Sequence, residues 1–464
     1  WNAAHTYDAT LFSPFFAEGA ETPTAYLCVR AHWMDLGAKD PGYVLDSTSV
    51  FQEGILFPGT RVFKEGRADP EILELIRFNS RLPDLVIGDL HAQVAALRTG
   101  ERRLAEIYER FGGSTVQAAI KLIFRHGEEQ TRAALRALPQ GSWTATDVLD
   151  DDGISSDPIA MQATVTIADG TFTVDFAGSA PATAGPVNMP FGGTLAMCKV
   201  ALKALTTPHE PGNGGHMRPL RVEAEPGTLF HAVHPAPTFT LWTGIVALEL
   251  IFKAVAQGMP ERLAASTGGD VPGFMMVGTH PDTGAMFAVS NNEPVGWGGT
   301  PSHDGAQATM HLSASIVRNT PIEVLESKTT MLVERLEFRR DSGGAGRFRG
   351  GCGLARTIRF LGDGEFLSVV KKTRTRPWGL AGGSDAETNG FVLFPGTERE
   401  RAVSTNREPV HAGDRVHVLS GGGGGHGDPG GRDPEKVRED VLEGYVSAEA
   451  ASCEYGLTVA EEQP

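Results

Sequence analysis

The sequence predicts a multi-domain α+β fold, with a mixed N-terminal region and a β-rich, glycine-rich C-terminal region. The chain has 464 residues, which is too long for one ordinary hydrophobic core and favours two or three globular regions. Apolar residues recur at helical spacing mainly before residue 265, whereas short strand-like stretches broken by glycine prevail after it. The 57 glycines and 29 prolines stand in short clusters without a repeat, which indicates many tight turns.

The first predicted region covers residues 1–150 and mixes strands with helices. The stretch AYLCVRAHW is typical of a strand. From Pro70 to about Arg110, the segments EILELIRFN and AQVAALRTGERRLAEIYERFG carry apolar residues at helical spacing with charges between them. We therefore expect helices over most of that stretch.

The acidic turn DVLDDDGISSD, which ends at Asp157, predicts a boundary near residue 150. It is followed by MQATVTIADGTFTVDFAG, a predicted strand pair in which Asp169-Gly170 is a hairpin signal. Two apolar helical patterns, TLAMCKVALKALTT and TGIVALELIFKAVAQ, complete an α+β middle region over residues 151–265. Residues 266–464 form the predicted β-rich region with its glycine-rich tail.

The composition excludes several classes of protein. With 57 acidic and 41 basic residues, the net charge of -16 would repel a phosphate backbone, so we expect no nucleic-acid partner. No apolar run reaches the roughly 18 residues that cross a bilayer, so we expect no membrane partner either. The cysteines show no CxxC spacing, which argues against a disulfide framework or a thiolate zinc site and fits the cytoplasm. They are Cys28, Cys198, Cys352 and Cys453.

The densest group of polar residues lies near the start of the chain. His5 and Asp8 stand three residues apart, and His32 and Asp35 repeat this spacing 27 residues later. Imidazoles and carboxylates together suit a hard or borderline divalent cation. Spacing alone leaves the alternative open that each histidine is an ordinary polar residue in a loop, with its hydrogen bonds satisfied.

His91 lies where a polar loop enters a helical pattern, in GDLHAQVAALRTGERRL. We expect Asp89 to cap this helix and His91 to lie in its first turn. A lone histidine at such a position is more often structural than catalytic. Only the neighbouring cluster makes His91 a candidate.

Two glycine-rich stretches have no matching nucleotide-binding pattern. SGGGGGHGDPGG, around His426, lacks the Lys and Ser or Thr of a phosphate-binding loop, so we expect a closely packed loop or a flexible crossing segment. In DSGGAGRFRGG, Arg347 and Arg349 could bind an anion or be solvated arginines of a hairpin connection. No GxSxG turn is present and no cysteine has a histidine beside it, so nucleophilic catalysis by serine or cysteine is not indicated.

Several segments, in the same order and over nearly the whole chain, resemble the hydantoinase B and oxoprolinase family. That family also includes subunits of acetone and acetophenone carboxylases and of caprolactamase. One such segment would be weak support, but the number and order of the segments exceed what chance resemblance produces. They are AHWMDLG, LDSTSVFQEGILFPGTRVF, GDLHAQVAALRTGERRL, GPVNMPFGG, NGGHMRPLRVEAEPGTL, RNTPIEVLESKTTMLVERLEFRRDSGGAGRFRGGCG, GGGGGHGDP and VREDVLEGYVS.

The resemblance implies a two-component, ATP-coupled enzyme that acts on a lactam, a hydantoin, 5-oxoproline or a related carbonyl substrate. A partner of the hydantoinase A type would bind ATP and phosphorylate the amide oxygen of the substrate. The present chain would then hydrolyse the phosphorylated substrate at a metal site. The chain shows no nucleotide-binding motif of its own, which agrees with this division of labour.

The resemblance also implies which residues form the site. The family's His-x-x-Asp pattern falls on His5 and Asp8, and its later Ala-His pattern falls on His32. We expect these three to bind a divalent ion, preferably manganese or zinc, which would lower the pKa of bound water. Asp35 or His91 would orient or deprotonate that water.

Two departures from the family pattern concern this site. Many members have two consecutive histidines where this chain has His32 and Trp33, so that an apolar wall would replace a polar ring. They also have two glycines where this chain has Gly37 and Ala38. Members ordinarily carry a considerable segment before the point where this chain starts, at Trp1, so we expect natural sequence to precede it.

Two other functions stay open at this point. Within the same family, the chain could be part of an ATP-dependent ketone carboxylase, in which the partner makes a phosphorylated enol and activated bicarbonate. From another class, it could be a non-catalytic scaffold for the ATP-handling subunit. The intact polar cluster argues against a scaffold, which has no need of it. In each case we expect a hetero-oligomer.

Overall fold

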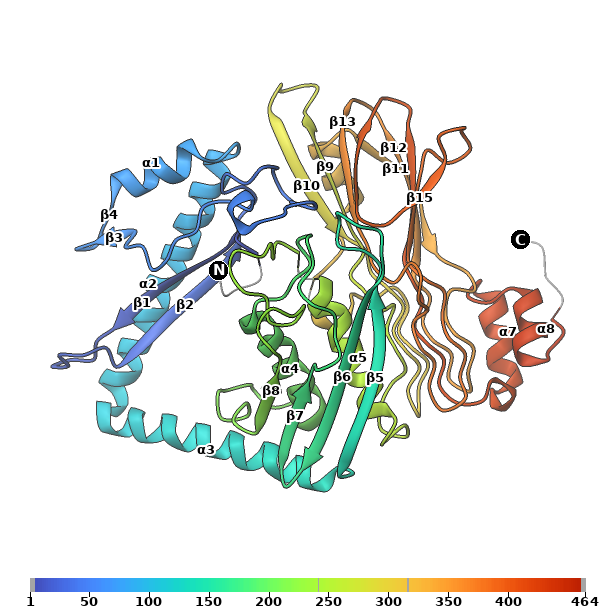
Figure 1. Cartoon of the computed structure of the whole chain (residues 1–464), viewed down its shortest axis with the longest axis horizontal. Helices are drawn as coiled ribbons and strands as arrows, with labels where there is room; N and C mark the ends of the chain where they lie inside the picture. Colours follow the sequence, from blue (N-terminus) through green and yellow to red (C-terminus); the bar gives the residue numbers. More distant parts are fainter. Residues whose placement is uncertain (1–4, 241, 315–316, 460–464) are drawn as a thin grey trace.

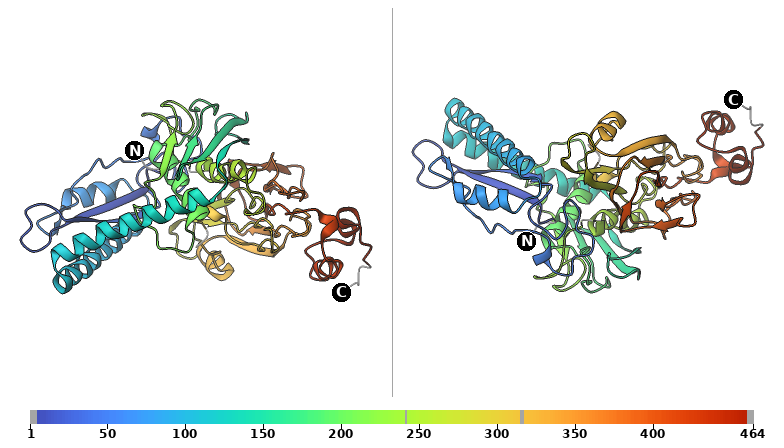
Figure 2. Two further views of the ribbon diagram at one scale, coloured as in Figure 1. Left: turned by 90° about the horizontal axis from the view of Figure 1, so that it is seen from below. Right: turned by 90° about the horizontal axis from the view of Figure 1, so that it is seen from above.

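The computed structural model describes residues 5–240, 242–314 and 317–459. Helices and strands are mixed in it, which confirms the predicted α+β class. Figure 1 shows an N-terminal arm in blue to cyan, a middle sheet with its helices in green, and a β-rich part in yellow to red. In two further views the arm and the last two helices lie at opposite ends of the molecule (Figure 2).

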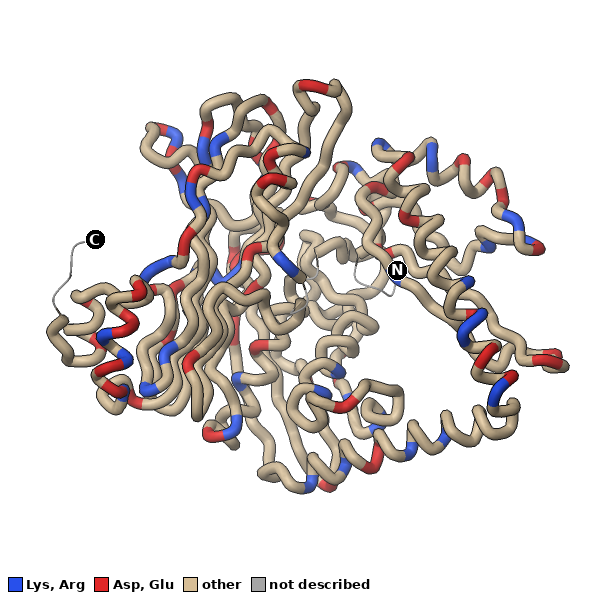
Figure 3. Tube along the Cα trace, turned by 180° about the vertical axis from the view of Figure 1, so that it is seen from behind, with Lys and Arg blue, Asp and Glu red and all other residues tan. Residues whose placement is uncertain are grey.

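The N-terminal arm is an antiparallel hairpin packed on a long helix. Its elements are β1 (Asp8–Phe15), β2 (Ala25–His32), η1 (Val50–Gln52), β3 (Phe63–Lys64), β4 (Arg67–Ala68), α1 (Pro70–Phe78), α2 (Pro83–Phe111) and α3 (Gly113–Ala137). Leu11 and Ala31 of the hairpin pack with Val86 and Leu90 of α2 in one apolar cluster. The helices predicted after Pro70 are confirmed, although the chain divides them at residues 79–82. Helix α3 carries charges of both signs along its length (Figure 3).

The middle part is a four-stranded sheet covered by two helices. Its elements are β5 (Gly141–Leu149), β6 (Ile159–Ala168), β7 (Thr171–Asp175), α4 (Phe191–Thr206), β8 (Leu220–Glu223) and α5 (Trp242–Ala256). The predicted hairpin between β6 and β7 is confirmed, and Asp169 and Gly170 have the positive φ angles, 51° and 70°, of a tight turn. The sheet already begins at Gly141, a few residues before the predicted boundary near residue 150.

The C-terminal part contains two antiparallel sheets with a shared aromatic core. Its elements are β9 (Gly273–Thr279), β10 (Met286–Asn292), η2 (Leu312–Ala314), α6 (Ile322–Lys328), β11 (Met331–Phe338), β12 (Leu354–Phe360), β13 (Gly364–Val369), β14 (Gly390–Leu393), β15 (Arg401–Val403), β16 (Asn406–Val410), β17 (Arg415–Leu419), η3 (Pro429–Gly431), α7 (Pro434–Leu442) and α8 (Ala448–Tyr455). The strand orders are β10-β9-β13-β16 and β11-β12-β17-β14-β15. Phe366 of the first sheet lies 5.6 Å from Phe360 and 6.2 Å from Phe391 of the second, measured between ring centroids. These contacts join the two sheets.

Five extended segments outside the named helices and strands form what we call the glycine layer. They are residues 265–269, 296–307, 342–353, 378–389 and 420–427, and they run side by side between β5 and α7 (Figure 1). Backbone bonds join them directly, for example from Gly344 N to Gly423 O (2.9 Å) and from Gly299 N to Gly424 O (2.8 Å). A Cβ atom on Gly350 would lie 1.7 Å from the carbonyl oxygen of Gly423. The tail around His426 is therefore a closely packed segment, as one of the two expectations had it.

The two arginines of DSGGAGRFRGG were expected either to bind an anion or to be solvated in a hairpin connection, and they differ from each other in the structure. Arg349 is buried and its guanidinium binds the Asp440 carboxylate (3.0 Å), so it is neither solvated nor free to bind an anion. Arg347 is exposed and stacks on Phe348, with the guanidinium carbon 5.6 Å from the ring centroid. The Arg349 pair fastens α7 to the glycine layer.

The acidic turn near residue 150, which was predicted to separate the first region from the middle region, binds two lysines of the C-terminal part. Lys371 Nζ donates to Asp151 Oδ1 (2.8 Å), and Lys372 Nζ donates to the Asp147 carboxylate. All four side chains are buried or nearly so. This acidic seam, formed by Asp147, Asp151, Lys371 and Lys372, ties β5 to the end of β13. Separately, no helix among the described residues is long and apolar enough to cross a membrane.

Candidate metal centre

The strand register of the N-terminal hairpin brings two of the predicted ligands together. Asp8 begins β1 and His32 ends β2, and the two residues are direct cross-strand partners. Side chains of directly opposed residues on one face lie within contact distance. His5 joins them through a turn, in which Asp8 N donates to His5 O (3.2 Å).

The three side chains could hold one metal ion. One ligand atom from each of His5, Asp8 and His32 lies within 4.8 Å of the others. Two ligands bound about 2.1 Å from one ion are at most about 4.2 Å apart, so the cluster would need only a small adjustment to bind one. Among the described residues, this is the one group of His, Cys, Asp and Glu that meets this criterion.

The neutral state and ring orientation of His5 suit a metal ligand. Its Nδ1 contacts the carbonyl oxygen of Phe239, and because a carbonyl can only accept, Nδ1 carries the hydrogen. The Nε2 lone pair is then free for a metal. Burial, and next to it the nearby His32, lower the pKa of His5 to about 4, so the ring is neutral at pH 7.

Asp8 is held as a carboxylate. Burial opposes its charge, but His32, His5 and Arg30 outweigh burial and hold the pKa of Asp8 well below its usual range. Arg30 binds Oδ2, and Oδ1 lies 3.4 Å from His32 Nδ1. The cluster therefore offers one anionic and two imidazole ligands.

Asp35 does not join this cluster. Its carboxylate is fully buried and accepts hydrogen bonds from the backbone and guanidinium of Arg81 (2.6–2.8 Å) and from the Tyr7 hydroxyl (3.1 Å). Burial raises the pKa of Asp35, but the Arg81 hydrogen bonds outweigh burial and bring it below the usual value. A carboxylate so fully bonded is a poor base, and these contacts anchor Arg81; the catalytic role expected of Asp35 stays a prediction.

His91 also lies apart from the cluster. Helix α2 begins at Pro83, so the expectation that Asp89 caps it and that His91 occupies its first turn is wrong. Both residues lie inside the helix, and His91 is exposed. The proline occupies the first helical position because it has no N–H to leave unsatisfied there.

Trp33 does not form the expected apolar wall beside the imidazoles. It is buried in the apolar cluster of the arm, and its Nε1 donates to Gln93 Oε1 (2.8 Å). Gln93 in turn donates to the carbonyls of Ala9 and Val29 in β1 and β2. Trp33 therefore helps to fix the hairpin on α2.

Sequence analysis missed Glu53, which lies in the loop after η1. Its carboxyl group is fully buried, and burial raises the pKa of Glu53 to about 7. It accepts from the backbone N–H of Phe239 (3.1 Å), the residue whose carbonyl contacts His5. The segment LDSTSVFQEG places no other ionisable side chain at a suggestive spacing, so only the fold reveals this residue.

A family model described as hydantoinase B/oxoprolinase matches residues 1–429. The chain belongs to the hydantoinase B/oxoprolinase family. It is 31% identical over 479 aligned residues to a protein assigned as the B component of a D-/L-hydantoinase from Pseudomonas sp. strain NS671, covering 99% of this chain and 80% of that protein. It is 29% identical to the beta component of caprolactamase from Pseudomonas jessenii, covering 98% of this chain and 80% of the relative. These matches confirm the resemblance inferred from the sequence segments.

Solved structures share the fold. The ATP-dependent caprolactamase of Pseudomonas jessenii superposes with a TM-score of 0.90 at 27% identity, over 99% of this chain and 81% of the other. An acetone carboxylase in its nucleotide-free form has a TM-score of 0.88 at 18% identity, over 99% of this chain and 68% of the other. The second likeness establishes a common architecture alone.

Proposed function

We propose that this chain is the metal-dependent component of an ATP-coupled cyclic amide hydrolase, which acts on a lactam, hydantoin or 5-oxoproline-type substrate phosphorylated by a hydantoinase A-type partner. The observation that carries the proposal is the His5, Asp8 and His32 cluster at the end of the β1–β2 hairpin. The relatives named as components of a hydantoinase and of caprolactamase support both the reaction class and the need for a partner.

The residues around the cluster have separable tasks. His5, Asp8 and His32 would hold the ion, preferably manganese or zinc, which when bound lowers the pKa of water towards neutrality and polarises a substrate oxygen. The Phe239 carbonyl keeps the His5 proton on Nδ1 and so keeps Nε2 available. Arg30 holds Asp8 Oδ2, which leaves Oδ1 as the oxygen facing His32.

Phosphorylation explains why such a site would need ATP. A lactam amide is a poor electrophile, whereas a phosphorylated amide oxygen is a far better leaving group. Neutral imidazoles and one carboxylate give the ion a net positive charge, which favours an anionic phosphorylated substrate. Turnover would therefore depend on the partner and on ATP.

The carboxylase alternative has weaker support. The acetone carboxylase is 18% identical to this chain, a level at which the shared fold carries no substrate information. The relatives with higher identity are named for amide hydrolysis. The scaffold alternative leaves the assembled cluster without a purpose.

A metal and turnover assay tests the proposal. Protein purified with its partner should contain close to one divalent transition metal per chain and consume ATP with one of hydantoins, 5-oxoproline or larger lactams, independently of bicarbonate. His32→Ala should lose most of the metal, whereas His411→Ala, at an exposed histidine far along the chain, should retain it. Active protein without metal, full metal in His32→Ala, or turnover of ketones that requires bicarbonate would each contradict the proposal.

A further inference from the structure

Glu53 is a buried carboxyl group with an uneven set of partners. All three of its side-chain donors bind Oε1: the Ser47 hydroxyl (2.7 Å) and the backbone N–H groups of Thr238 (2.8 Å) and Phe239 (3.1 Å). Oε2 is buried and has no hydrogen-bond partner among the described residues. Burying a carboxyl group costs free energy unless it is hydrogen-bonded, so a buried carboxyl group with one oxygen unpartnered needs an explanation.

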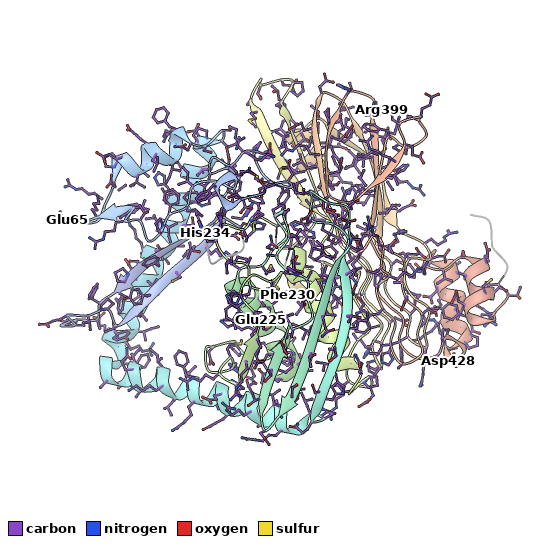
Figure 4. The ribbon with its side chains drawn as sticks, in the orientation of Figure 1. Glu65, Glu225, Phe230, His234, Arg399 and Asp428 are labelled. Carbon is purple, nitrogen blue, oxygen red and sulfur yellow. The ribbon has the colours of Figure 1, made fainter. Side chains whose placement is uncertain are left out.

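The loop that holds Glu53 is fastened to a segment of the middle region. Pro235 O accepts from Val50 N (3.0 Å), and the rings of Phe51 and His234 lie 5.2 Å apart, with His234 labelled in Figure 4. The hydroxyl of Thr6, the residue next to His5, donates to the backbone carbonyl of Glu53. The metal cluster, the Glu53 loop and the middle segment are thus bound to one another.

Phe239 connects Glu53 to His5 through its own backbone. Its N–H donates to Glu53 Oε1, and its carbonyl oxygen accepts from His5 Nδ1. The Phe239 carbonyl lies in the peptide unit that it shares with Thr240, whose N–H donates to Pro186 O (2.8 Å), and Glu53 holds the chain on the other side of this unit by binding the N–H groups of Thr238 and Phe239. The His5 ring orientation therefore depends on a carboxyl group that it does not touch.

We propose that Glu53 is a positioning residue of the metal centre, which fixes the Phe239 carbonyl and thereby selects the Nδ1–H form of His5 with Nε2 directed at the metal. The metal-binding part of this inference rests on the proposed function, whereas the effect on the His5 ring does not. Outer groups that orient a ligand histidine typically change metal affinity about 10- to 100-fold.

The first test measures the His5 ring in metal-free protein labelled with ¹⁵N-histidine, in which the nitrogen shifts report the tautomer. Wild type should show Nδ1–H. Glu53→Met, which keeps the volume but removes the acceptor, should give a mixture of tautomers. Glu53→Gln should restore the wild-type pattern, because an amide oxygen can accept the same three donors. Unchanged His5 signals in Glu53→Met would overturn the proposal.

The second test measures binding of Mn²⁺ and Zn²⁺ by calorimetry. Glu53→Met should bind about 10- to 100-fold more weakly than wild type, and Glu53→Gln within a few-fold of it. Thr131→Val, which removes a buried hydroxyl of α3 that makes no hydrogen bond to the hairpin or to Phe239, is the matched control and should bind as wild type does. Equal affinity in Glu53→Met and wild type would overturn the proposal.

The two tests separate this inference from the proposed function. If wild type binds neither metal, the proposed metal centre is wrong. The tautomer measurement on metal-free protein still tests whether Glu53 orients His5. If Glu53→Met does not fold, as judged by circular dichroism, Glu53→Asp takes its place, because a carboxylate one methylene shorter cannot reach both N–H groups. The same tautomer mixture is then expected, and its absence overturns the inference.

Discussion

Asp8 and Asp35 show how the same side chain acquires different chemistry from its partners. Asp8 shares its charge with an exposed arginine and two imidazoles, so one oxygen remains able to face a cation. Asp35 is enclosed by Arg81, which supplies its backbone N–H and two guanidinium nitrogens. Asp35 thereby joins the turn after β2 to the link between α1 and α2.

This anchoring role predicts the effect of Asp35→Asn. The substitution leaves Arg81 partly unpaired beside a buried site, so the free energy of unfolding should fall by about 2–4 kcal/mol. Metal content should stay at the wild-type level, since Asp35 is not among the three clustered ligands. Denaturant unfolding and elemental analysis check both. A variant of unchanged stability whose turnover falls about a hundredfold would instead restore Asp35 as a general base.

The limits of prediction at this scale follow from strand register. His5, Asp8 and His32 could be named from the sequence, and the cross-strand pairing of Asp8 with His32 explains why they meet. Asp35 has the same spacing from a histidine but lies beyond the end of β2, where the hairpin no longer sets its direction. Glu53 acts through Phe239, which is distant in sequence, and no local pattern could have indicated that contact.

At the scale of elements, the glycine layer depends on the absence of side chains. Its neighbouring segments approach so closely that a single methyl group would overlap a backbone atom, as at Gly350. The backbone groups of the layer find their partners in adjacent segments instead of in a helix or a regular sheet. Close approach of two backbones is a use of glycine that needs no positive φ angle.

This close approach predicts a sharp difference between two glycines of the C-terminal part. Gly350→Ala should lower the free energy of unfolding by several kcal/mol, about 3 or more, or prevent folding, because the Gly423 carbonyl cannot move without breaking the layer. Gly390→Ala, in β14 and with nothing within 4 Å of the added Cβ, should change it by less than about 1 kcal/mol. Thermal unfolding of the two variants tests this. Similar melting temperatures for Gly350→Ala and Gly390→Ala would contradict this prediction and show that the glycine layer can make room for a methyl group.

Periodic elements were easier to predict than their ends. The apolar spacing after Pro70 indicates helices, and α1 and α2 occur there. The interruption between them does have a local signal, Pro83, which favours the first position of a helix. The start of α2 was placed too late because Asp89 was taken as the cap instead, and His91 was therefore assigned to the wrong turn.

At the scale of the whole molecule, the acidic seam joins parts that the sequence suggested were separate. Lys371 is buried against Asp151, and its backbone N–H donates to Asp270, which is also fully buried. Buried pairs of this kind contribute little net stability when intact but cost several kcal/mol when one partner is removed. The seam therefore makes the unfolding of the middle and C-terminal parts interdependent.

Asp270 predicts a dependence of global stability on pH. Burial raises the pKa of Asp270 to about 7, whereas an unfolded aspartate has a pKa of about 3.9. The folded state therefore binds more protons between these values, so this residue's contribution is fully present below about pH 4 and is lost as pH rises to about 7. At pH 8 the free energy of unfolding of Asp270→Asn should exceed that of wild type by on the order of 4 kcal/mol, and near pH 4 the two should be similar. Parallel unfolding curves for the two proteins at all pH values would contradict this assignment.

The glycine layer also has a consequence for the order of folding. Gly344 and Gly299 bind residues 423 and 424, which are separated from them by long stretches of chain and are made late in synthesis. The loop-closure entropy for these contacts must be overcome before any of them forms, which makes their formation slow. Residues 296–307 and 342–353 can bond to each other before the tail is made, as Gly351 N does to Trp297 O (2.8 Å), but the groups that bind residues 423 and 424 must wait for it. During that interval these open backbone groups can pair with other chains, which makes the nascent protein a candidate for help from a chaperone.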